Sequence, residues 1–510
     1  MVLADIIRRN TRRFPDDLAF VFKENRFTFK QYEERVNRLA NALKGLGIKK
    51  GERISVILDN CHHHYEILGA AAKGGFVMSP LSTALKQELS HLIGNAQSTA
   101  IIVGDNHADK VLKEWDSVKR VICVGKSPEG MDDYEGLLAK SSADDPQEEV
   151  TGEDGLLLYY TSGTTGLPKG AYLTNDAIIK EAENQLIGSG YRYHNEVFMT
   201  LHPLYFTVPT NCTVVPAMYI ACPVVITEQY SPETFLKTVE KERVTGTFVV
   251  PTMVFRLLQH PDIHKYDLSS LRYIGYGSAP MPLEVIKKSI ERFGNIFFQG
   301  YGLTESTASV TCLPVEDHKL EGTEKELQRL QSCGRELPNA WIRVVRADGT
   351  DIRRDLTEIG EIIIMCEHNL KEYFGMPEET KKALTEDGWL HTGDMAAMDE
   401  DGYIYIKDRK KDMIVSGGIN IFPREVEEVL FTHQKVADAA VVGKPDEEWG
   451  EKVKAYIVLR EGETATEQEI IDYTKERLAS YKKPKEVQFL KALPKGSTGK
   501  TLKRELRDKY

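Results

Sequence analysis

The sequence predicts a two-domain α/β protein, with a large N-terminal domain of layered α/β sheets that includes a β-rich subdomain, followed by a small α+β domain. Three observations predict this fold class. Apolar strand-like runs alternate with amphipathic helical stretches through the first four hundred residues, which is typical of largely parallel sheets. From about residue 360 the pattern changes to strands bounded by Gly and Asp turns. A highly charged segment at 407–412 then precedes a further mixture of helices and strands.

The N-terminal domain is expected to span residues 1–407 of the 510-residue chain, which is long enough for two domains. Residues 31–46 and 232–241 have the spacing of amphipathic helices. Between such stretches lie short apolar runs with the character of buried strands. These predicted strands are 54–58, 100–103, 121–124, 156–160, 224–226 and 247–250.

The end of the chain is expected to form the second domain. The β-rich subdomain, residues 360–406, still belongs to the N-terminal domain. Residues 408–412 read as a hinge and 413–510 as the C-terminal domain. Within the last of these, helices are predicted at 423–431 and 467–478, and strands at 437–442 and 453–459.

Composition narrows the class of protein. The net charge of -11 argues against a nucleic-acid partner, because binding to phosphates normally needs a basic face. Seven dispersed cysteines indicate reduced thiols and a cytoplasmic location. Residues 197–227 carry no Asp, Glu, Lys or Arg, but four prolines interrupt them, so we expect buried strand, loop and helix pieces and no transmembrane segment. A homo-oligomer is compatible with the sequence.

A loop rich in Gly, Ser and Thr follows the apolar run 156–160. Glycines allow the backbone to approach a phosphate closely, while hydroxyls, backbone N–H groups and one lysine supply donors and positive charge. The loop does not match the Gly-x-x-x-x-Gly-Lys-Ser/Thr pattern of ordinary P-loop NTPases. An ordinary surface loop is disfavoured by the strand before it and the lysine after it. The predicted nucleotide-binding residues are Thr161, Ser162, Gly163, Thr164, Thr165 and Lys169.

This loop resembles the signature of the adenylate-forming superfamily, which includes acyl-CoA synthetases, coumarate–CoA ligases, luciferases and peptide-synthetase adenylation domains. Further segments resemble the motifs of that family in the same order, so that the resemblance covers essentially the whole chain. These segments are 275–280, 299–305, 389–394, 408–412 and 494–500.

The resemblance implies a nucleotide site. Tyr301 offers a flat face for adenine, and Asp394 would accept hydrogen bonds from the ribose hydroxyls. Arg409 would bind ribose or phosphate. The backbone of two further segments would line the adenine and acid pockets. Their residues are Gly277, Ser278, Ala279, Gln299 and Gly300.

The resemblance also implies the catalytic residues. Thr304 would hold the α-phosphate, and Glu305 would supply an oxygen ligand for Mg²⁺, with Thr161 as a weaker metal candidate. Lys500 would be the main catalytic residue, because a cation near the α-phosphorus stabilises the charge that builds up as a carboxylate attacks. Lys411 matches the family's hinge, about which a mobile C-terminal domain would turn between two half-reactions.

The resemblance also bears on the positions that would contact the carboxylic acid and coenzyme A. Gly417 and Gly418 would line the coenzyme A tunnel; the other reading of the pair is a tight turn, and both readings can hold together. Phe206 occupies a site where many relatives have His, so it is expected to be a pocket wall and not a base. Gly302 replaces a bulky aromatic of acetate-specific relatives, which suggests an acid larger than propionate. In Cys61–His64, three adjacent imidazoles cannot all face one ion on a helix, so a helix-start surface patch is favoured over a metal site.

Together the motifs imply an ATP- and Mg²⁺-dependent carboxylic acid–coenzyme A ligase for an aryl, alicyclic or medium-chain acid. A stand-alone ligase that loads a carrier protein is the alternative. Luciferase-type oxidation is less favoured, and an inactive scaffold is disfavoured because Lys500, Asp394 and Glu305 are all present. A kinase or simple ATPase would release ADP instead of AMP. The sequence alone does not identify the acid.

Overall fold

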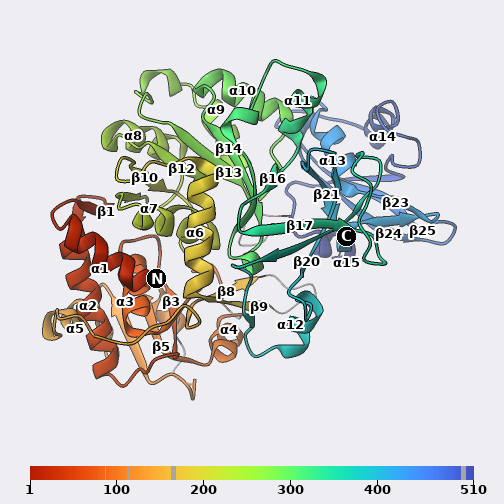
Figure 1. The fold of residues 1–510 in the computed structure, drawn as a ribbon. Coiled ribbons are helices and arrows are strands. Elements are labelled where there is room, and N and C mark those ends of the chain that lie inside the picture. The colour runs from red at the N-terminus through yellow and green to blue at the C-terminus, as the bar shows by residue number, and fades with distance from the viewer. Residues whose placement is uncertain (87, 112–114, 162–167, 496–500, 510) are drawn as a thin grey trace. The chain divides into compact units, whose positions relative to one another are not determined.

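The computed structural model describes residues 1–86, 88–111, 115–161, 168–495 and 501–509 (Figure 1). The chain divides into two compact units. Unit 1 comprises Met1–Ile342 and Ile364–Leu390, and unit 2 comprises Arg343–Ile363 and His391–Tyr510. The predicted hinge at 408–412 concerns movement and stays a prediction.

One sheet of unit 1 is mainly parallel, as the sequence predicts. Its strand order is β19-β9-β8-β4-β3-β5-β6-β7, with antiparallel pairing at β8–β9 and β9–β19. The strands are β3 (Arg53–Ile57), β4 (Val77–Pro80), β5 (Ser98–Gly104), β6 (Arg120–Val124), β7 (Asp132–Asp133), β8 (Gly155–Thr161), β9 (Lys169–Thr174) and β19 (Glu372–Tyr373). The elements around it are α1 (Leu3–Arg13), α2 (Phe29–Gly45), α3 (His63–Gly74), α4 (Glu88–Ala96), η1 (Asp105–Lys110), α5 (Tyr134–Lys140) and α12 (Pro377–Ala383).

The second sheet of unit 1 has the order β16-β15-β14-β13-β12-β10-β11-β1-β2. Its strands are β1 (Leu18–Phe22), β2 (Asn25–Thr28), β10 (Phe198–Thr200), β11 (Val224–Ile226), β12 (Gly246–Val249), β13 (Tyr273–Gly277), β14 (Phe297–Gly302), β15 (Ser309–Leu313) and β16 (Arg335–Glu336). The helices and short turns are α6 (Asn175–Ser189), η2 (Pro209–Val214), α7 (Val215–Tyr219), α8 (Pro232–Glu242), α9 (Pro251–Leu258), η3 (Ile263–Lys265), α10 (Leu283–Phe293), η4 (Thr304–Ser306), η5 (Val315–Asp317), α11 (Glu324–Gln328) and η6 (Arg329–Gln331). All six predicted strands of the N-terminal domain are confirmed.

Local signals explain where the predicted helices begin. Thr28 caps α2 by accepting a hydrogen bond from the backbone of Gln31, whose side chain in turn accepts one from the Thr28 backbone N–H. In α6, which was not predicted, the hydroxyl of Thr174 accepts a hydrogen bond from the backbone N–H of Ala177. Ser231 caps α8, and Pro232 occupies its first turn, where the missing N–H costs nothing.

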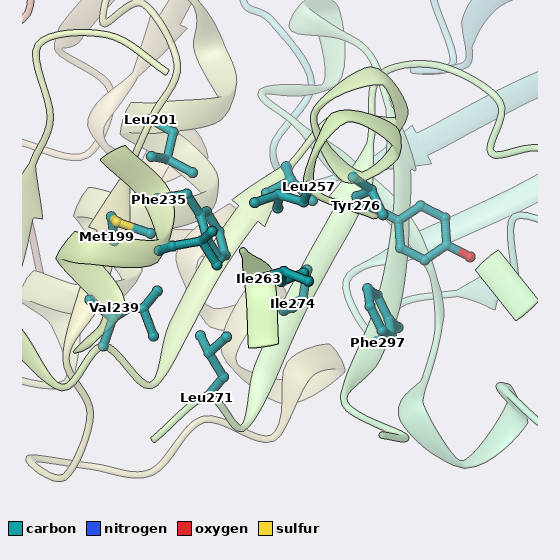
Figure 2. Close-up of a cluster of buried hydrophobic side chains, with 14 of the residues drawn as sticks. Met199, Leu201, Phe235, Val239, Leu257, Ile263, Leu271, Ile274, Tyr276 and Phe297 are labelled. Atoms are coloured by element: carbon teal, nitrogen blue, oxygen red, sulfur yellow. The ribbon is translucent and has the colours of Figure 1, made fainter. Parts of the chain in front are cut away.

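The helix α6 is the element that joins the two sheets. It contacts β9 of the first sheet and β15 of the second. Beside the second sheet, side chains from β10, β13, β14, α8 and α9 pack into a dry core (Figure 2). Close packing of such side chains makes a core rigid. The core therefore fixes β13 and β14, whose ends carry two of the predicted motifs.

The uncharged stretch 197–227 is confirmed as core. It forms β10, the π-helical turn η2, α7 and β11, and Pro209 and Pro216 lie at the first turns of their helices. Among the helices of the described residues, none combines the length and apolar character that crossing a membrane requires.

The β-rich subdomain is a sheet in the order β17-β18-β20-β21, formed by β17 (Ala340–Val345), β18 (Gly360–Cys366), β20 (Leu390–Met398) and β21 (Ile404–Arg409). The rest of unit 2 has the strand order β23-β22-β25-β24, with β26 on β25. Its elements are η7 (Lys410–Asp412), β22 (Ile414–Ser416), β23 (Ile419–Ile421), α13 (Pro423–Phe431), β24 (Val436–Asp446), β25 (Gly450–Leu459), α14 (Glu467–Lys475), β26 (Glu486–Phe489) and α15 (Lys503–Lys509). The predicted α+β character is confirmed.

Candidate active site

The turn between β14 and β15 carries Thr304 and Glu305. Both lie on the short helix η4, and Ser306 closes it by accepting a hydrogen bond from the backbone N–H of Leu303 at 3.1 Å. Thr307 follows with φ +63°, a left-handed conformation that is uncommon and costly for a branched residue. The chain therefore reverses sharply at the motif that the sequence singles out.

Glu305 is the meeting point of three segments. Its Oε1 accepts hydrogen bonds from Thr161 Oγ1 at 3.3 Å and from the Tyr373 hydroxyl at 2.7 Å. Its backbone carbonyl accepts one from the N–H of Leu370 at 2.7 Å. The structure thus brings Thr161 and Glu305 together, as predicted. A carboxylate and a hydroxyl are hard oxygen donors that suit Mg²⁺, so these residues fit the expected metal.

Lys169, the lysine of the predicted phosphate loop, is held at the start of β9. It is 8% exposed and forms an ion pair with Glu379 of α12. Its Nζ also lies 5.0 Å from the centroid of the Tyr373 ring, a distance at which a cation is attracted to the ring face. Tyr373 therefore contacts both the lysine and the carboxylate of the site.

Thr304 is placed by the segment before η2. Its hydroxyl lies 3.2 Å from that of Thr207. The neighbouring Phe206 packs edge-on against Tyr205, with ring centroids 4.6 Å apart. Phe206 carries no ionisable group, and its expected pocket-wall role stays a prediction.

Two predicted segments meet because β13 and β14 pair in parallel, with Gly277 opposite Gly300 and Tyr276 opposite Gln299. A Cβ at position 277 would overlap the carbonyl oxygen of Gly300, so glycine is required there. Ser278 has φ +62°, which turns the chain away from the sheet directly after β13. The following Ala279 is exposed, and Tyr301 is half-buried.

Gly302 lies at a bulge where β14 and β15 change register. A Cβ at this position would overlap the backbone carbonyl of Ala308. Backbone packing is therefore sufficient reason for glycine here. The inference that Gly302 opens the acid pocket stays a prediction, and the structure offers this second explanation.

In unit 2, Asp394 and Arg409 face each other across the β20–β21 pair. Arg409 Nε lies 2.6 Å from Asp394 Oδ1, and Asp394 is 4% exposed. Lys411 lies in η7, and its neighbour Lys410 pairs with Glu361 at 2.8 Å. The two predicted ribose ligands are thus neighbours that neutralise each other's charge.

Gly417 and Gly418 form the turn of the β22–β23 hairpin, with φ +58° and +77°. Both angles favour glycine, and a Cβ on Gly417 would lie 2.7 Å from the Trp449 ring. The tight-turn reading is confirmed, and the coenzyme A role stays a prediction. Lys500 and the loop residues 162–165 lie outside the described residues.

Comparisons with known proteins agree with this geometry. The family model described as AMP-binding enzyme matches residues 7–374, and the AMP-binding enzyme C-terminal domain matches residues 425–500. The chain belongs to the AMP-binding enzyme family. The resemblance to adenylate-forming enzymes is confirmed.

The relatives of this AMP-binding enzyme match along most of their length. It is 34% identical over 503 residues to a feruloyl-CoA synthase of an Amycolatopsis species, covering 98% of each chain. It is 35% identical over 493 residues to the long-chain-fatty-acid–CoA ligase FadD13 of Mycobacterium tuberculosis, covering 95% of this chain and 93% of that protein. The crystal structure of the anthranilate CoA ligase AuaEII in complex with anthranoyl-AMP matches with a TM-score of 0.89 at 25% identity, covering 99% and 96%.

The histidines that follow Cys61 in this AMP-binding enzyme do begin a helix, because α3 starts at His63. The expected surface patch is wrong, since His62 and His64 are 9% and 2% exposed. His62, His63 and Glu66 bring ligand atoms within 4.8 Å of one another. However, Arg35 donates to both oxygens of Glu66 at 2.6 and 3.0 Å. A bidentate guanidinium occupies the carboxylate that a metal would need.

Tyr373, Glu379 and Thr207 were missed by the sequence interpretation. Tyr373 is 68 residues from Glu305, and Glu379 is 210 residues from Lys169. Their residue types alone do not indicate a phosphate or metal site. Tyr373 reaches the site because it ends a strand that pairs with β9, where Lys169 lies, and the sequence did not predict that pairing.

Proposed function

We propose that this AMP-binding enzyme is an AMP-forming carboxylic acid–coenzyme A ligase. In the first half-reaction a carboxylate oxygen bonds to the α-phosphorus of ATP, and the bond to pyrophosphate breaks. In the second, the sulfur of coenzyme A bonds to the acyl carbon, AMP leaves with the electron pair of the broken C–O bond, and the thiol proton passes to solvent. The products are acyl-CoA, AMP and pyrophosphate.

The observation that carries this proposal is the contact of Tyr373 with both Lys169 and Glu305. A lysine and a carboxylate placed by one residue suit the two charges of a metal–triphosphate, the lysine for phosphate oxygens and the carboxylate for the metal. Thr304, one residue before Glu305, would donate to an α-phosphate oxygen. Asp394 would exchange its contact with Arg409 for the ribose hydroxyls.

Mg²⁺ belongs to the proposal, with Glu305 and Thr161 as its protein ligands. When bound, it would neutralise the charge of the phosphate oxygens. The chain's own work is then to orient ATP and the acid at a distance suited to attack, which is a large part of the rate gain in such reactions.

Lys500 would supply the cation at the α-phosphorus in the first half-reaction. Turning of the C-terminal domain about Lys411 would then place Gly417 and Gly418 along the path of coenzyme A. These assignments follow from the motif order in the sequence. A cytoplasmic location is also proposed, supported by seven cysteines that form no disulfide.

The proposed acid is aryl, or medium- to long-chain aliphatic. The relatives are named for feruloyl and long-chain fatty acids, and Phe206 offers an apolar wall. A panel of benzoate, ferulate, cyclohexanecarboxylate, octanoate, palmitate and acetate, scored by pyrophosphate release with and without coenzyme A, tests the proposal. Release with an aryl or longer acid, and conversion to acyl-CoA, is expected. Release of pyrophosphate without thioester formation, restored by an added carrier protein, would favour the carrier-loading alternative.

A further inference from the structure

Two fully buried titratable side chains lie behind the Thr304–Glu305 turn. Glu181 projects from α6, and His368 follows β18. Both side chains are 0% exposed, and His368 Nε2 lies 3.5 Å from Glu181 Oε2. The sequence reasoning attached no chemistry to either residue.

The pair is tied to the far end of the turn. Glu181 Oε1 accepts a hydrogen bond from the backbone N–H of Ser309 at 2.9 Å. The carbonyl of His368 accepts one from the hydroxyl of Thr307 at 2.6 Å. From η2, Asn211 Nδ2 donates to the carbonyl of Thr307 at 2.8 Å. The residue with the left-handed backbone is therefore held from two sides.

The near end of the turn is fixed by the same segment. Leu370, two residues after His368, donates its N–H to the carbonyl of Glu305 at 2.7 Å. Tyr373 then reaches the Glu305 carboxylate. The stretch from His368 to Tyr373 thus contacts the turn at Thr307 and at Glu305. Glu181 of α6 contacts the same turn at Ser309.

Burial keeps the pair without net charge. Desolvation raises the pKa of the Glu181 carboxyl well above its ordinary value, and it lowers the pKa of His368 to about 4. Glu181 Oε2 and His368 Nε2 lie 3.5 Å apart and have no hydrogen-bond partner among the described residues, so the contact between the two side chains is polar but not a hydrogen bond. The thiols of Cys212 and Cys366 interact electrostatically with Glu181, and burial raises the pKa of each.

Such a pair costs desolvation that an apolar pair of similar volume would avoid. The position of the Glu181–His368 pair beside Thr307 indicates what it contributes. The Thr307 conformation is strained, and strain persists only where surrounding contacts determine it. The His368 carbonyl holds the hydroxyl of Thr307, and Glu181 holds the backbone of Ser309 two residues later.

We propose that Glu181 and His368 are positioning residues, which hold the turn from Thr304 to Ser309 so that Thr304 and Glu305 face the metal–triphosphate. The inference rests on the proposed function. Neither residue touches the reacting atoms. Glu181 acts through the backbone N–H of Ser309. The His368 side chain acts through Glu181, and the His368 carbonyl holds the Thr307 hydroxyl.

The test compares Glu181→Ala, Glu181→Gln and His368→Asn in the full-length chain. Glutamine keeps the acceptor for Ser309 N–H and a polar group beside His368, so E181Q is expected to keep the rate constant of pyrophosphate release within about threefold. E181A removes both contacts, and a shift of the turn by about 1 Å is expected to lower that rate constant roughly 100-fold. KM for the acid should change little.

Glu196 offers a matched control. It is also buried, and Arg272 Nη2 and Thr245 Oγ1 each lie 2.6 Å from it, away from the turn. E196Q is expected to lower the melting temperature without changing the rate constant of the folded enzyme. Equal losses of rate in E196Q and E181A would mean that generic destabilisation explains both, and would overturn the proposal.

A second readout does not depend on turnover. Binding of Mn²⁺ in the presence of α,β-methylene-ATP, followed by electron paramagnetic resonance, is expected to weaken about tenfold in E181A and H368N and to stay near wild type in E181Q. A folded E181A with wild-type Mn²⁺ affinity and wild-type rate would overturn the inference, as would an E181Q as impaired as E181A. If wild type releases no pyrophosphate with any acid, the proposed function fails, and the Mn²⁺ titration still decides on the positioning role.

Discussion

Tyr373 connects the two charged groups of the candidate site at the scale of single residues. Its hydroxyl donates to Glu305, and its ring lies beside the ammonium of Lys169. Hydrogen bonds to a charged acceptor contribute about 1.5–3 kcal/mol net. Removing the hydroxyl leaves the ring and its contact with Lys169 in place.

Tyr373→Phe is therefore expected to lower kcat/KM for Mg·ATP by about 10- to 100-fold, as the energy of one hydrogen bond to a charged group implies. The Mg²⁺ concentration for half-maximal rate should rise. Pyrophosphate release at varied ATP and Mg²⁺ measures both. An unchanged Mg²⁺ requirement in Y373F would contradict the role given to Tyr373.

Glycine at position 302 has two possible explanations, and one substitution distinguishes them. If backbone packing requires glycine, Gly302→Ala displaces the β14–β15 bulge and lowers the rate with every acid by a similar factor. If the missing side chain instead enlarges the acid pocket, G302A lowers kcat/KM for large acids and leaves kcat/KM for acetate unchanged. We expect the first result. Relative kcat/KM values across the acid panel decide between them.

At the scale of elements, the site depends on how β13, β14 and the strands beside them end. Parallel pairing sets Gly277 against Gly300, and their backbones approach too closely for a side chain. Substitutions in such a packed place typically cost 1–3 kcal/mol, because neighbouring groups have to move.

Gly277→Ala is accordingly expected to lower the free energy of unfolding by about 1–3 kcal/mol. Gly94, near the end of α4, has open space around its Cα, so Gly94→Ala should stabilise the protein by roughly 0.5–1 kcal/mol. Urea denaturation of both variants measures this. A G277A variant as stable as G94A would contradict the close approach of the two strands.

Periodicity is what made these elements predictable. Runs such as 100–103 are apolar on both faces, as buried parallel strands are, and they are confirmed as parts of β5 and its neighbours. The π-helical turn η2 was not predicted, because nothing in the local pattern separates it from an α-helix. Thr161 and Glu305 were both named as metal candidates from the family resemblance, and the structure places them together. Tyr373, Glu379 and Glu181 were not predicted, because their roles arise from contacts between distant segments.

At the scale of the whole molecule, buried histidines link stability to pH. Burial lowers the pKa of His62 to about 3 and that of His64, His202, His318 and His368 to about 4. An unfolded histidine titrates near 6.5. Between pH 6.5 and 4 the unfolded chain therefore binds protons that the folded chain does not, and stability falls as the pH falls. Glu181 acts in the opposite direction, since its pKa is raised.

His202→Leu isolates one of these groups, because burial is the sole cause of its shift. The slope of the unfolding free energy against pH should fall by about 1.4 kcal/mol per pH unit near pH 5. Urea denaturation at pH 7, 6 and 5 measures the slope, with the exposed His264→Leu as control. Equal slopes in H202L and wild type would contradict the burial of a neutral imidazole.

The two half-reactions can be separated through Lys500. Lys500→Ala is expected to slow adenylation by about two to three orders of magnitude, by analogy with lost transition-state donors. Thioester formation from supplied acyl-AMP and coenzyme A should be largely retained. ATP–pyrophosphate exchange and acyl-CoA formation measure the two steps. A K500A variant that exchanges pyrophosphate at the wild-type rate would contradict the role of the tail.

The identity of the phosphate products tests the central claim most directly. Phosphorus-31 NMR of one reaction that contains ATP, Mg²⁺, coenzyme A and an accepted acid resolves AMP and pyrophosphate from ADP and inorganic phosphate. The account predicts AMP and pyrophosphate in equal amounts, each matching the acyl-CoA formed. ADP and inorganic phosphate as the products that accompany acyl-CoA would contradict it.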